Sequence, residues 1–408
     1  MVPNKTKTTK PVMSLYQQYS TIFDGITTPA AWVDMDKFDN NIQTNLTRAN
    51  HRSIRIASKS VRCVHLLRYL LNASQQFNGI MCYHPQEAAL LVDEGFDDLL
   101  IAYPSLCRDS LMAALQASTK PAKLYFMVDR VEHVALLDGL AAELNIKANL
   151  CLDLDMSVPF PGVHFGVHRS NIKTPRQAVE FYRRIKGFQH INLCGLMGYE
   201  AQIAGLGDQV PGKILQNIVV RYLKKKSLPI IHDRRTETIL VLLHEGAQLT
   251  LINGGGTGSI ESTIQEPLVN EVTVGSGFYC SHLFDYYRNF KLEPAAGFVT
   301  SVARKPSADI VTCNGGGYVA SGNAERIKMP QPYLPAGLKL DPNEGTGEVQ
   351  TPLHTQQCKQ ALEPGDPVFF RHAKAGELCE HFNQLHLIRD GVIEDTVTTY
   401  RGNGWVFM

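Results

Sequence analysis

Lys59 directly follows a short apolar run, residues 54–58, whose composition is typical of a buried β-strand. A lysine held at the mouth of a cavity must be paired or must lower its pKa, and a desolvated lysine can form a Schiff base with a carbonyl compound. A side chain that extends into solvent from the strand end is the alternative. The position of Lys59 therefore leaves two interpretations open, a Schiff-base lysine and a surface lysine.

A glycine-rich segment, residues 253–259, follows another apolar run. The backbone N–H groups of such a loop can converge on an anion, and the hydroxyl groups of Thr257 and Ser259 add donors. The segment lacks the Gly-Lys-Ser/Thr of a nucleotide-binding P-loop and the GxGxxG spacing of a dinucleotide site. It therefore predicts a phosphate site, with a flexible connector as the alternative.

The elements that must position these residues alternate regularly from residue 30 to about residue 280. Short apolar runs are separated by stretches with apolar residues at helical spacing. Eight such repeats predict a closed (β/α)8 barrel, with an open doubly wound sheet as the alternative, and a barrel would present Lys59 and the glycine loop at one end. The eight runs are 54–58, 79–83, 99–103, 123–128, 149–155, 191–199, 249–254 and 270–275.

Beyond residue 295 the pattern changes to short extended runs with turn signals between them, which predicts an antiparallel β domain. A second glycine cluster at 315–320 fits GxGxxG/A, but Pro330 and Pro332 interrupt any complete βαβ unit, so a tight turn is predicted there. The chain is thus divided into a flexible leader (1–28), a barrel (29–280) and a β domain (281–408), to which residues 29–36 could contribute the first strand.

Composition narrows the functional classes. The 408 residues are 44% apolar, with 40 basic side chains against 39 acidic ones, which argues against a strongly basic nucleic-acid binder and an acidic disordered chain. No apolar run approaches the ~20 residues that cross a bilayer. Nine cysteines without CxxC spacing are typical of reduced thiols in the cytoplasm. The leader carries Lys5, Lys7 and Lys10 but no arginine, which favours a frayed terminus over a transit peptide.

A lysine after the first barrel strand and a phosphate loop after the seventh form a specific combination. In these features the sequence resembles the fold-type III pyridoxal 5'-phosphate (PLP) enzymes, the alanine racemase-like barrels. Within them it is most similar to the D-threonine aldolase and D-serine dehydratase branch and to proteins called amino acid aldolase or racemase-like. The resemblance covers nearly all of residues 28–395. It is carried by the segments 28–36, 58–60, 166–170, 254–259, 275–279 and 371–377.

This resemblance implies PLP as cofactor and assigns roles to individual residues. Lys59 would form the Schiff base with PLP, and Arg169 would lie beside the phenolic oxygen of the cofactor. Tyr199 and Gln202 would face the ring or the substrate. Enzymes of this fold that carry a β domain usually pair, so a homodimer is expected by analogy. The residues implied to hold the phosphate are Gly255, Gly256, Thr257, Gly258, Ser259 and Tyr279.

The chain departs from the D-threonine aldolase pattern at two places. Histidines two residues to either side of the lysine are replaced by Ala57 and Val61. The C-terminal histidine that would bind a divalent metal is matched by His372, but its partner two residues later is Lys374, which cannot act as a ligand while charged. Cys379 is the nearest replacement.

Imidazole with thiolate suits zinc, and Mn or Mg are the other candidates. In the alternative interpretation His372 is a hydrogen-bonding residue and Cys379 is a core residue. His381 and His386 are expected to be structural.

The leading functional hypothesis is a PLP-dependent lyase that cleaves or dehydrates a small β-hydroxy amino acid of D configuration, with His372 acting at the β-hydroxyl group. An amino acid racemase is the first alternative; it needs a second base opposite Lys59, usually a tyrosine from the β domain of the other subunit, for which Tyr318 is the candidate. A non-catalytic PLP-binding protein and a barrel for another phosphorylated ligand are further alternatives. The region of about 110 residues beyond residue 295 favours an enzyme with a closed substrate site.

Overall fold

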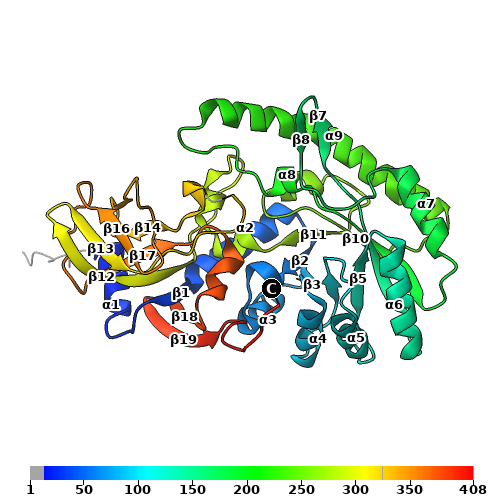
Figure 1. Cartoon of the computed structure of the whole chain (residues 1–408), viewed down its shortest axis with the longest axis horizontal. Helices are drawn as coiled ribbons and strands as arrows, with labels where there is room; N and C mark the ends of the chain where they lie inside the picture. Colours follow the sequence, from blue (N-terminus) through cyan, green and yellow to red (C-terminus); the bar gives the residue numbers. More distant parts are fainter. Residues whose placement is uncertain (1–12, 324, 408) are drawn as a thin grey trace, which may run out of the picture.

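The computed structural model describes residues 13–323 and 325–407. All eight predicted runs form strands of one closed barrel, in the order β10-β11-β2-β3-β4-β5-β6-β9. Figure 1 shows several of these strands, among them β2, β3, β5, β10 and β11, in the right-hand part of the molecule. Every pair in the barrel is parallel, and β11 pairs with β2, so the alternative of an open sheet is excluded. The strands are β2 (Ser53–Ala57), β3 (Phe77–Cys82), β4 (Leu99–Ile101), β5 (Leu124–Val128), β6 (Ala148–Asp153), β9 (Ile191–Gly198), β10 (Leu251–Gly254) and β11 (Glu271–Val274).

Helices lie between the barrel strands, and some of them begin at a residue whose side chain accepts a hydrogen bond from a free backbone N–H group. Asp34 caps α2, and Thr174 caps α7, which continues with Pro175 in its first turn. Buried leucine, valine and phenylalanine side chains of these helices cover the outside of the barrel. The helices are α2 (Met35–Ala49), α3 (Val64–Ala73), α4 (Pro85–Asp93), α5 (Arg108–Ala117), α6 (Val131–Glu143), α7 (Pro175–Ile185), α8 (Ala201–Ala204), α9 (Ile214–His244), α10 (Ile260–Thr263) and α11 (Ser276–Tyr279).

The second part of the molecule is the predicted β domain, a mostly antiparallel nine-stranded sheet. Strand β1 comes from the N-terminal region and lies in its centre, antiparallel to β12 and parallel to β18. The glycine cluster at 315–320 follows β13, and no βαβ unit is built on it. The strands are β1 (Ala30–Asp34), β12 (Ala296–Ser307), β13 (Ile310–Asn314), β14 (Gln331–Leu334), β15 (Lys339–Leu340), β16 (Gln350–His354), β17 (Pro367–Arg371), β18 (Gln384–Arg389) and β19 (Val392–Thr398).

The expected flexible leader needs a correction where the structure describes it. Helix α1 (Leu15–Ile22) begins with a capping box at Ser14 and packs on the β domain. Buried Tyr19 lies edge-on against Trp32 and Phe369, and its hydroxyl group donates to Asp34 at 2.5 Å. Lys5, Lys7 and Lys10 lie outside the described residues.

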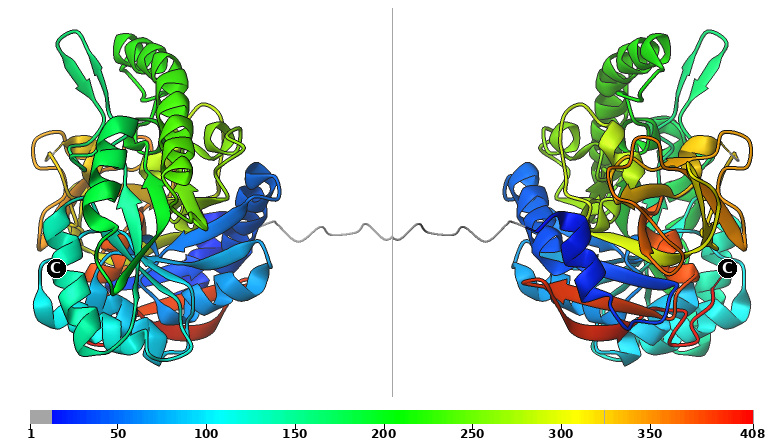
Figure 2. Two further views of the ribbon diagram at one scale, coloured as in Figure 1. Left: turned by 90° about the vertical axis from the view of Figure 1, so that its right-hand side faces the viewer. Right: turned by 90° about the vertical axis from the view of Figure 1, so that its left-hand side faces the viewer.

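Two segments project from the barrel on the side where its strands have their C-terminal ends. The hairpin of β7 (Val158–Phe160) and β8 (Val163–Phe165) stands beside the long helix α9 (Figure 2). In the described part of the chain no helix has the length and apolar character needed to span a membrane. All nine cysteines are unbridged.

Candidate active site

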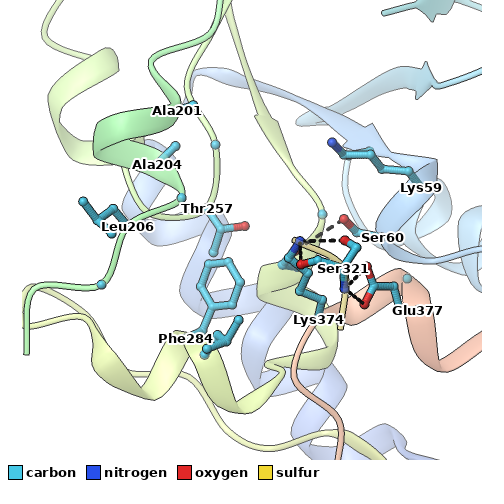
Figure 3. Close-up of a pocket in the computed structure, with 18 of the residues that line it drawn as sticks. Lys59, Ser60, Ala201, Ala204, Leu206, Thr257, Phe284, Ser321, Lys374 and Glu377 are labelled. Carbon is cyan, nitrogen blue, oxygen red and sulfur yellow. Dashed lines mark hydrogen bonds between the residues drawn. The ribbon is translucent and has the colours of Figure 1, made fainter. Parts of the chain in front are cut away.

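One cavity of about 1880 Å³ lies between the C-terminal ends of the barrel strands and the β domain. Barrel residues form one part of its wall, and residues of the β domain, including Ser321, Lys374 and Glu377, form another (Figure 3). The predicted site residues that line it are Lys59, Arg169, Tyr199, Gly255, Gly256 and Thr257.

Lys59 lies in the single 3₁₀ turn η1 (Ser58–Ser60) that continues β2. Its ammonium group donates to the Tyr103 hydroxyl at 2.9 Å, and its carbonyl oxygen accepts from Arg62 Nε at 2.9 Å. Although burial raises the pKa of Tyr103, the charges and hydrogen bonds of Lys59 and Arg169 lower it below its usual value. Lys59 therefore faces the cavity beside a phenol that is easier to ionise than usual.

Arg169 is held in place by contacts to the ends of two barrel strands. Its Nε donates to Asp153 Oδ2 at 2.7 Å, and its Nη2 donates to the carbonyl of Ala102 at 2.8 Å. The guanidinium carbon lies 5.0 Å from the ring centre of Tyr103 and 5.9 Å from that of Tyr199. Burial raises the pKa of Asp153 to about 6, although Arg169 acts in the opposite direction. The pair thus fixes a cation at the cavity wall.

The glycine loop continues β10 and leads into α10. Gly255 has φ +76°, which favours glycine. A methyl group on Gly256 would lie 2.9 Å from Ala204 Cβ, and one on Gly258 would lie 2.4 Å from the Ala204 carbonyl oxygen. In residues 13–323 and 325–407 no acceptor is present for the amide groups of Thr257 and Gly258. The loop thus keeps two donors available for an anion.

The buried carboxylate of Glu200 holds this loop in place through hydrogen bonds. It accepts hydrogen bonds from the Gly255 amide at 3.2 Å, from the Ser259 hydroxyl at 3.0 Å and from the Thr263 hydroxyl. Arg235, fully buried on α9, donates to Glu200 at 2.7 Å and also pairs with Glu266. The charge of Glu200 is thereby balanced without using the donors that face the cavity.

Several predicted residues lie away from the cavity. Ser259 supports the loop, since its oxygen also accepts from the Gly256 amide at 3.1 Å. The Gln202 amide donates to the Met156 carbonyl at 2.7 Å, and the buried Tyr279 hydroxyl donates to the Val61 carbonyl at 2.9 Å. None of these three side chains, nor Gly258, is part of the cavity wall. Their geometry indicates supporting roles instead of direct contacts.

The residues expected to bind a divalent metal do not form such a site. His372 is buried outside the cavity wall, and neither of its ring nitrogens has a hydrogen-bond partner among the described residues. Burial raises the pKa of the Cys379 thiol, which donates to the Val61 carbonyl at 3.4 Å. Within the described ranges no group of three His, Cys, Asp or Glu side chains is placed to hold a metal ion. These residues therefore do not fit the expected metal.

Sequence reasoning missed several residues that complete the site. Tyr103 and Asp153 lie in runs recognised as barrel strands, 99–103 and 149–155, and Glu200 directly follows such a run, so their place at strand ends could have identified them. Arg235 carries no such signal, because it reaches the loop from the middle of α9. Lys374 was noted only as a poor ligand, yet its side chain lines the cavity.

The arrangement fits PLP. Lys59 offers an amine at the cavity wall, the Thr257 amide at the same wall is suited to a phosphate group, and Arg169, held by Asp153, supplies a positive charge there. The close packing of Gly256 and Gly258 on Ala204 leaves the backbone of the loop exposed to the ligand, since side chains there are excluded.

Comparisons with known proteins agree with this arrangement. The profile of the family described as alanine racemase, N-terminal domain, matches residues 33–279. A D-threonine aldolase from Arthrobacter sp. is 21% identical over 385 residues, which is 91% of each chain. The structure of D-threonine aldolase from Filomicrobium marinum superposes with a TM-score of 0.78 at 18% identity and covers 94% of this chain and 96% of that one.

A second solved structure, D-threo-3-hydroxyaspartate dehydratase from Delftia sp. HT23, superposes with a TM-score of 0.73 at 17% identity and covers 92% of this chain and 98% of its own. An alanine racemase-like protein from Idiomarina loihiensis gives 0.70 at 14% identity, with 92% and 97% covered. The barrel-plus-sheet fold is thus shared along almost the whole length. Because the family profile matches well over half of the sequence, the chain belongs to the alanine racemase N-terminal domain family and is a fold-type III PLP enzyme.

Proposed function

We propose that this protein is a PLP-dependent lyase that acts on a β-hydroxy amino acid of D configuration. The observation that carries the proposal is the convergence of Lys59, Arg169 and the free Thr257 amide of the glycine loop on one cavity closed by the β domain. The relatives that cover nearly the full length, a D-threonine aldolase and a D-threo-3-hydroxyaspartate dehydratase, support the substrate class and its configuration.

Bound PLP supplies an electron sink for the pair of electrons left at Cα when a bond to that carbon breaks. In dehydration the Cα–H bond breaks, Lys59 Nζ takes the proton, and the β-hydroxyl group leaves as water. In retro-aldol cleavage the β-hydroxyl group gives its proton to a base, the Cα–Cβ bond breaks and an aldehyde leaves, and Cα takes up a proton to give the second product, an amino acid. Both routes need a group that moves a proton at the β-hydroxyl oxygen.

Tyr103 takes the role that the sequence had assigned to His372. His372 does not line the cavity, whereas Tyr103 does, and its hydroxyl oxygen lies 2.9 Å from Lys59 Nζ. Its lowered pKa makes the phenol a better proton carrier than an ordinary tyrosine. Arg169 holds this phenol in a positive environment.

A racemase would need a base opposite Lys59, and the sequence suggested Tyr318. That side chain is packed in the β domain, stacked on His381 with ring centres 4.3 Å apart and edge-on against Phe298. It does not line the cavity of its own chain, so as a second base it would have to reach the cavity of a partner subunit. The lyase is the better supported proposal because the aldolase and dehydratase relatives match nearly the full length of the chain.

The test is a product assay with purified, PLP-loaded protein. D- and L-threonine, D- and L-serine and the isomers of 3-hydroxyaspartate are each incubated, and aldehyde, ammonia and the mirror-image amino acid are measured separately. The proposal expects aldehyde or ammonia from the D isomers. Formation of the mirror-image amino acid alone would establish a racemase, and no product from any substrate would contradict the lyase.

A further inference from the structure

Two lysines of the β domain, Lys328 and Lys374, meet at the wall of the active-site cavity. The Lys374 ammonium donates to the Ser321 hydroxyl at 2.9 Å and to the Ser321 carbonyl at 3.1 Å. The Lys328 ammonium donates to the same carbonyl oxygen at 3.1 Å. Two positive charges therefore share one neutral acceptor, and Figure 3 shows Lys374 and Ser321 joined in this way beside Glu377.

Neither ammonium group forms an ion pair with a carboxylate of the described residues. The lysines that form ion pairs in the described ranges are Lys37, Lys120, Lys224 and Lys305. The carboxylate of Glu377 instead accepts from the Ser321 amide, at 3.2 Å and 3.1 Å to its two oxygens. It thus orients the Ser321 backbone instead of pairing directly with the lysines.

The lysine pair lies next to the reactive end of the cavity. A methyl group on Gly376 would lie only 1.7 Å from the Lys59 carbonyl oxygen, so the segment that carries Lys374 packs directly on the Lys59 backbone. Burial lowers the pKa of Lys374, and the charges of Lys328 and Lys59 lower it further, although Glu377 opposes them. Partly buried cations that repel one another are costly unless a ligand brings negative charge.

We propose that Lys328 and Lys374, held together by Ser321, form the subsite that binds a carboxylate group of the substrate. The inference rests on the proposed function for the identity of the ligand as an amino acid. The carboxylate is either the one on Cα or the second one of a dicarboxylic β-hydroxy amino acid, since both carry the same charge and geometry. A planar carboxylate can accept from both ammonium groups at once.

The test titrates malonate, a dicarboxylate without an amino group, into PLP-loaded protein and follows binding by calorimetry. The variants are K328M and K374M, with K374R to retain the charge. K147M is the matched control, because Lys147 is exposed just before β6, at the end of the barrel away from the cavity. We expect at least about a tenfold loss of malonate affinity in both Lys-to-Met variants and none in K147M.

The visible absorbance of bound PLP should be unchanged in all of these variants, and K374R should retain most of the malonate affinity. Equal malonate binding by wild type and K374M, or loss of PLP from K374M, would overturn the subsite. Failure of the proposed function would appear differently, as no product from any β-hydroxy amino acid while malonate binding still depends on the two lysines.

The increase in KM in K374M, measured for 3-hydroxyaspartate and for threonine, shows which carboxylate group of the substrate the two lysines bind. A larger increase for 3-hydroxyaspartate than for threonine in K374M indicates the side-chain carboxylate, and an equal increase indicates the carboxylate on Cα; both support the subsite. No increase for either substrate would contradict it.

Discussion

At the scale of single residues, the site depends on how neighbouring charges change Lys59 and Tyr103. The two side chains share a 2.9 Å hydrogen bond, and Arg169 adds a second positive charge above the Tyr103 ring. These cations stabilise the phenolate, so Tyr103 loses its proton at a lower pH than an ordinary tyrosine. Arg169 keeps its place because Asp153 binds it from the end of β6.

Replacing Tyr103 with phenylalanine should change the pH dependence of activity as well as its size. In wild type we expect an alkaline limb of the kcat/KM profile that lies below the usual tyrosine pKa of about 10. The Y103F variant should lack this limb and lose about 10-fold or more in kcat. Steady-state kinetics from pH 6 to 10 check this, and an unchanged profile in Y103F would remove Tyr103 from proton transfer.

At the scale of elements, the glycine loop is shaped by what packs behind it. Glu200, which follows β9, and Arg235, from the middle of α9, form a buried ion pair that fixes the Gly255 amide and the Ser259 hydroxyl. Helix α8 approaches from the other side, where Ala204 contacts the loop. The Thr257 amide, which has no acceptor among the described residues, is then left to face a ligand at the cavity wall.

Substitution of Gly258 by alanine should weaken PLP binding. The new methyl group would lie 2.4 Å from the Ala204 carbonyl oxygen and 2.5 Å from the Tyr287 ring, so the backbone must move. Such overpacking costs about 1–3 kcal/mol, equivalent to roughly 5- to 150-fold in affinity if the loop bears it. Equilibrium dialysis with PLP measures the change.

The matched control for this substitution is G139A. Gly139 lies in α6 with nothing within 4 Å of the added methyl group. G139A should bind PLP as wild type does. Equal PLP affinity of G258A and G139A would show that the packing of the loop on α8 does not position its amides.

At the scale of the whole molecule, the barrel and the β domain are joined by buried groups as well as by the chain. Strand β1 precedes the barrel in sequence but lies inside the β-domain sheet. His372 is buried after β17, where its carbonyl accepts from the His282 amide at 3.1 Å and its ring lies 6.3 Å from that of Tyr279. Burial lowers the pKa of His372 to about 3, with His282 and Arg371 acting in the same direction.

This histidine should make the fold sensitive to acid. In the unfolded chain a histidine has a pKa near 6.5, so between pH 6.5 and about 3 the unfolded state binds the extra proton and stability falls as pH falls. One such proton corresponds to about 1.4 kcal/mol per pH unit. In H372L this part of the slope should disappear.

Urea unfolding of wild type and H372L between pH 7 and 4 measures the difference. Because both proteins contain Glu87 and Glu266, the comparison cancels the contribution of these residues to the pH dependence of stability. Burial raises the pKa of both carboxyl groups to about 7, so their contribution increases stability as pH falls, opposite to that of His372. Parallel pH curves for the two proteins would contradict the buried, neutral state of His372.

The sequence was most informative where chemistry and strand periodicity coincide. All eight barrel strands, Lys59 and the cavity-lining part of the glycine loop could be predicted, because parallel strands are apolar runs and their C-terminal ends share one edge. Tyr279, Gln202 and His372 were expected to contact ligands and instead lie outside the cavity wall. The direction of these side chains is set by tertiary packing, which strand periodicity does not encode.

The contacts that cross the molecule could not be predicted. Arg235 lies 35 residues after Glu200 in the chain and donates to it from α9. Lys328 and Lys374 lie in different segments of the β domain, and both donate to the Ser321 carbonyl oxygen. Nothing in local periodicity encodes such pairings. Helix α1 could not be predicted for the same reason, since its buried residue Tyr19 packs against Trp32 and Phe369, which lie outside the helix.

The central claim is that Lys59 holds PLP in this cavity, and one measurement tests it most directly. Wild type, K59A and K59R are loaded with PLP, freed of excess cofactor and scanned for visible absorbance. Wild type should retain the absorbance of lysine-bound PLP, and both variants should lose it together with all lyase activity, because neither alanine nor arginine supplies the amine. Retention of the same absorbance in K59A would contradict the account.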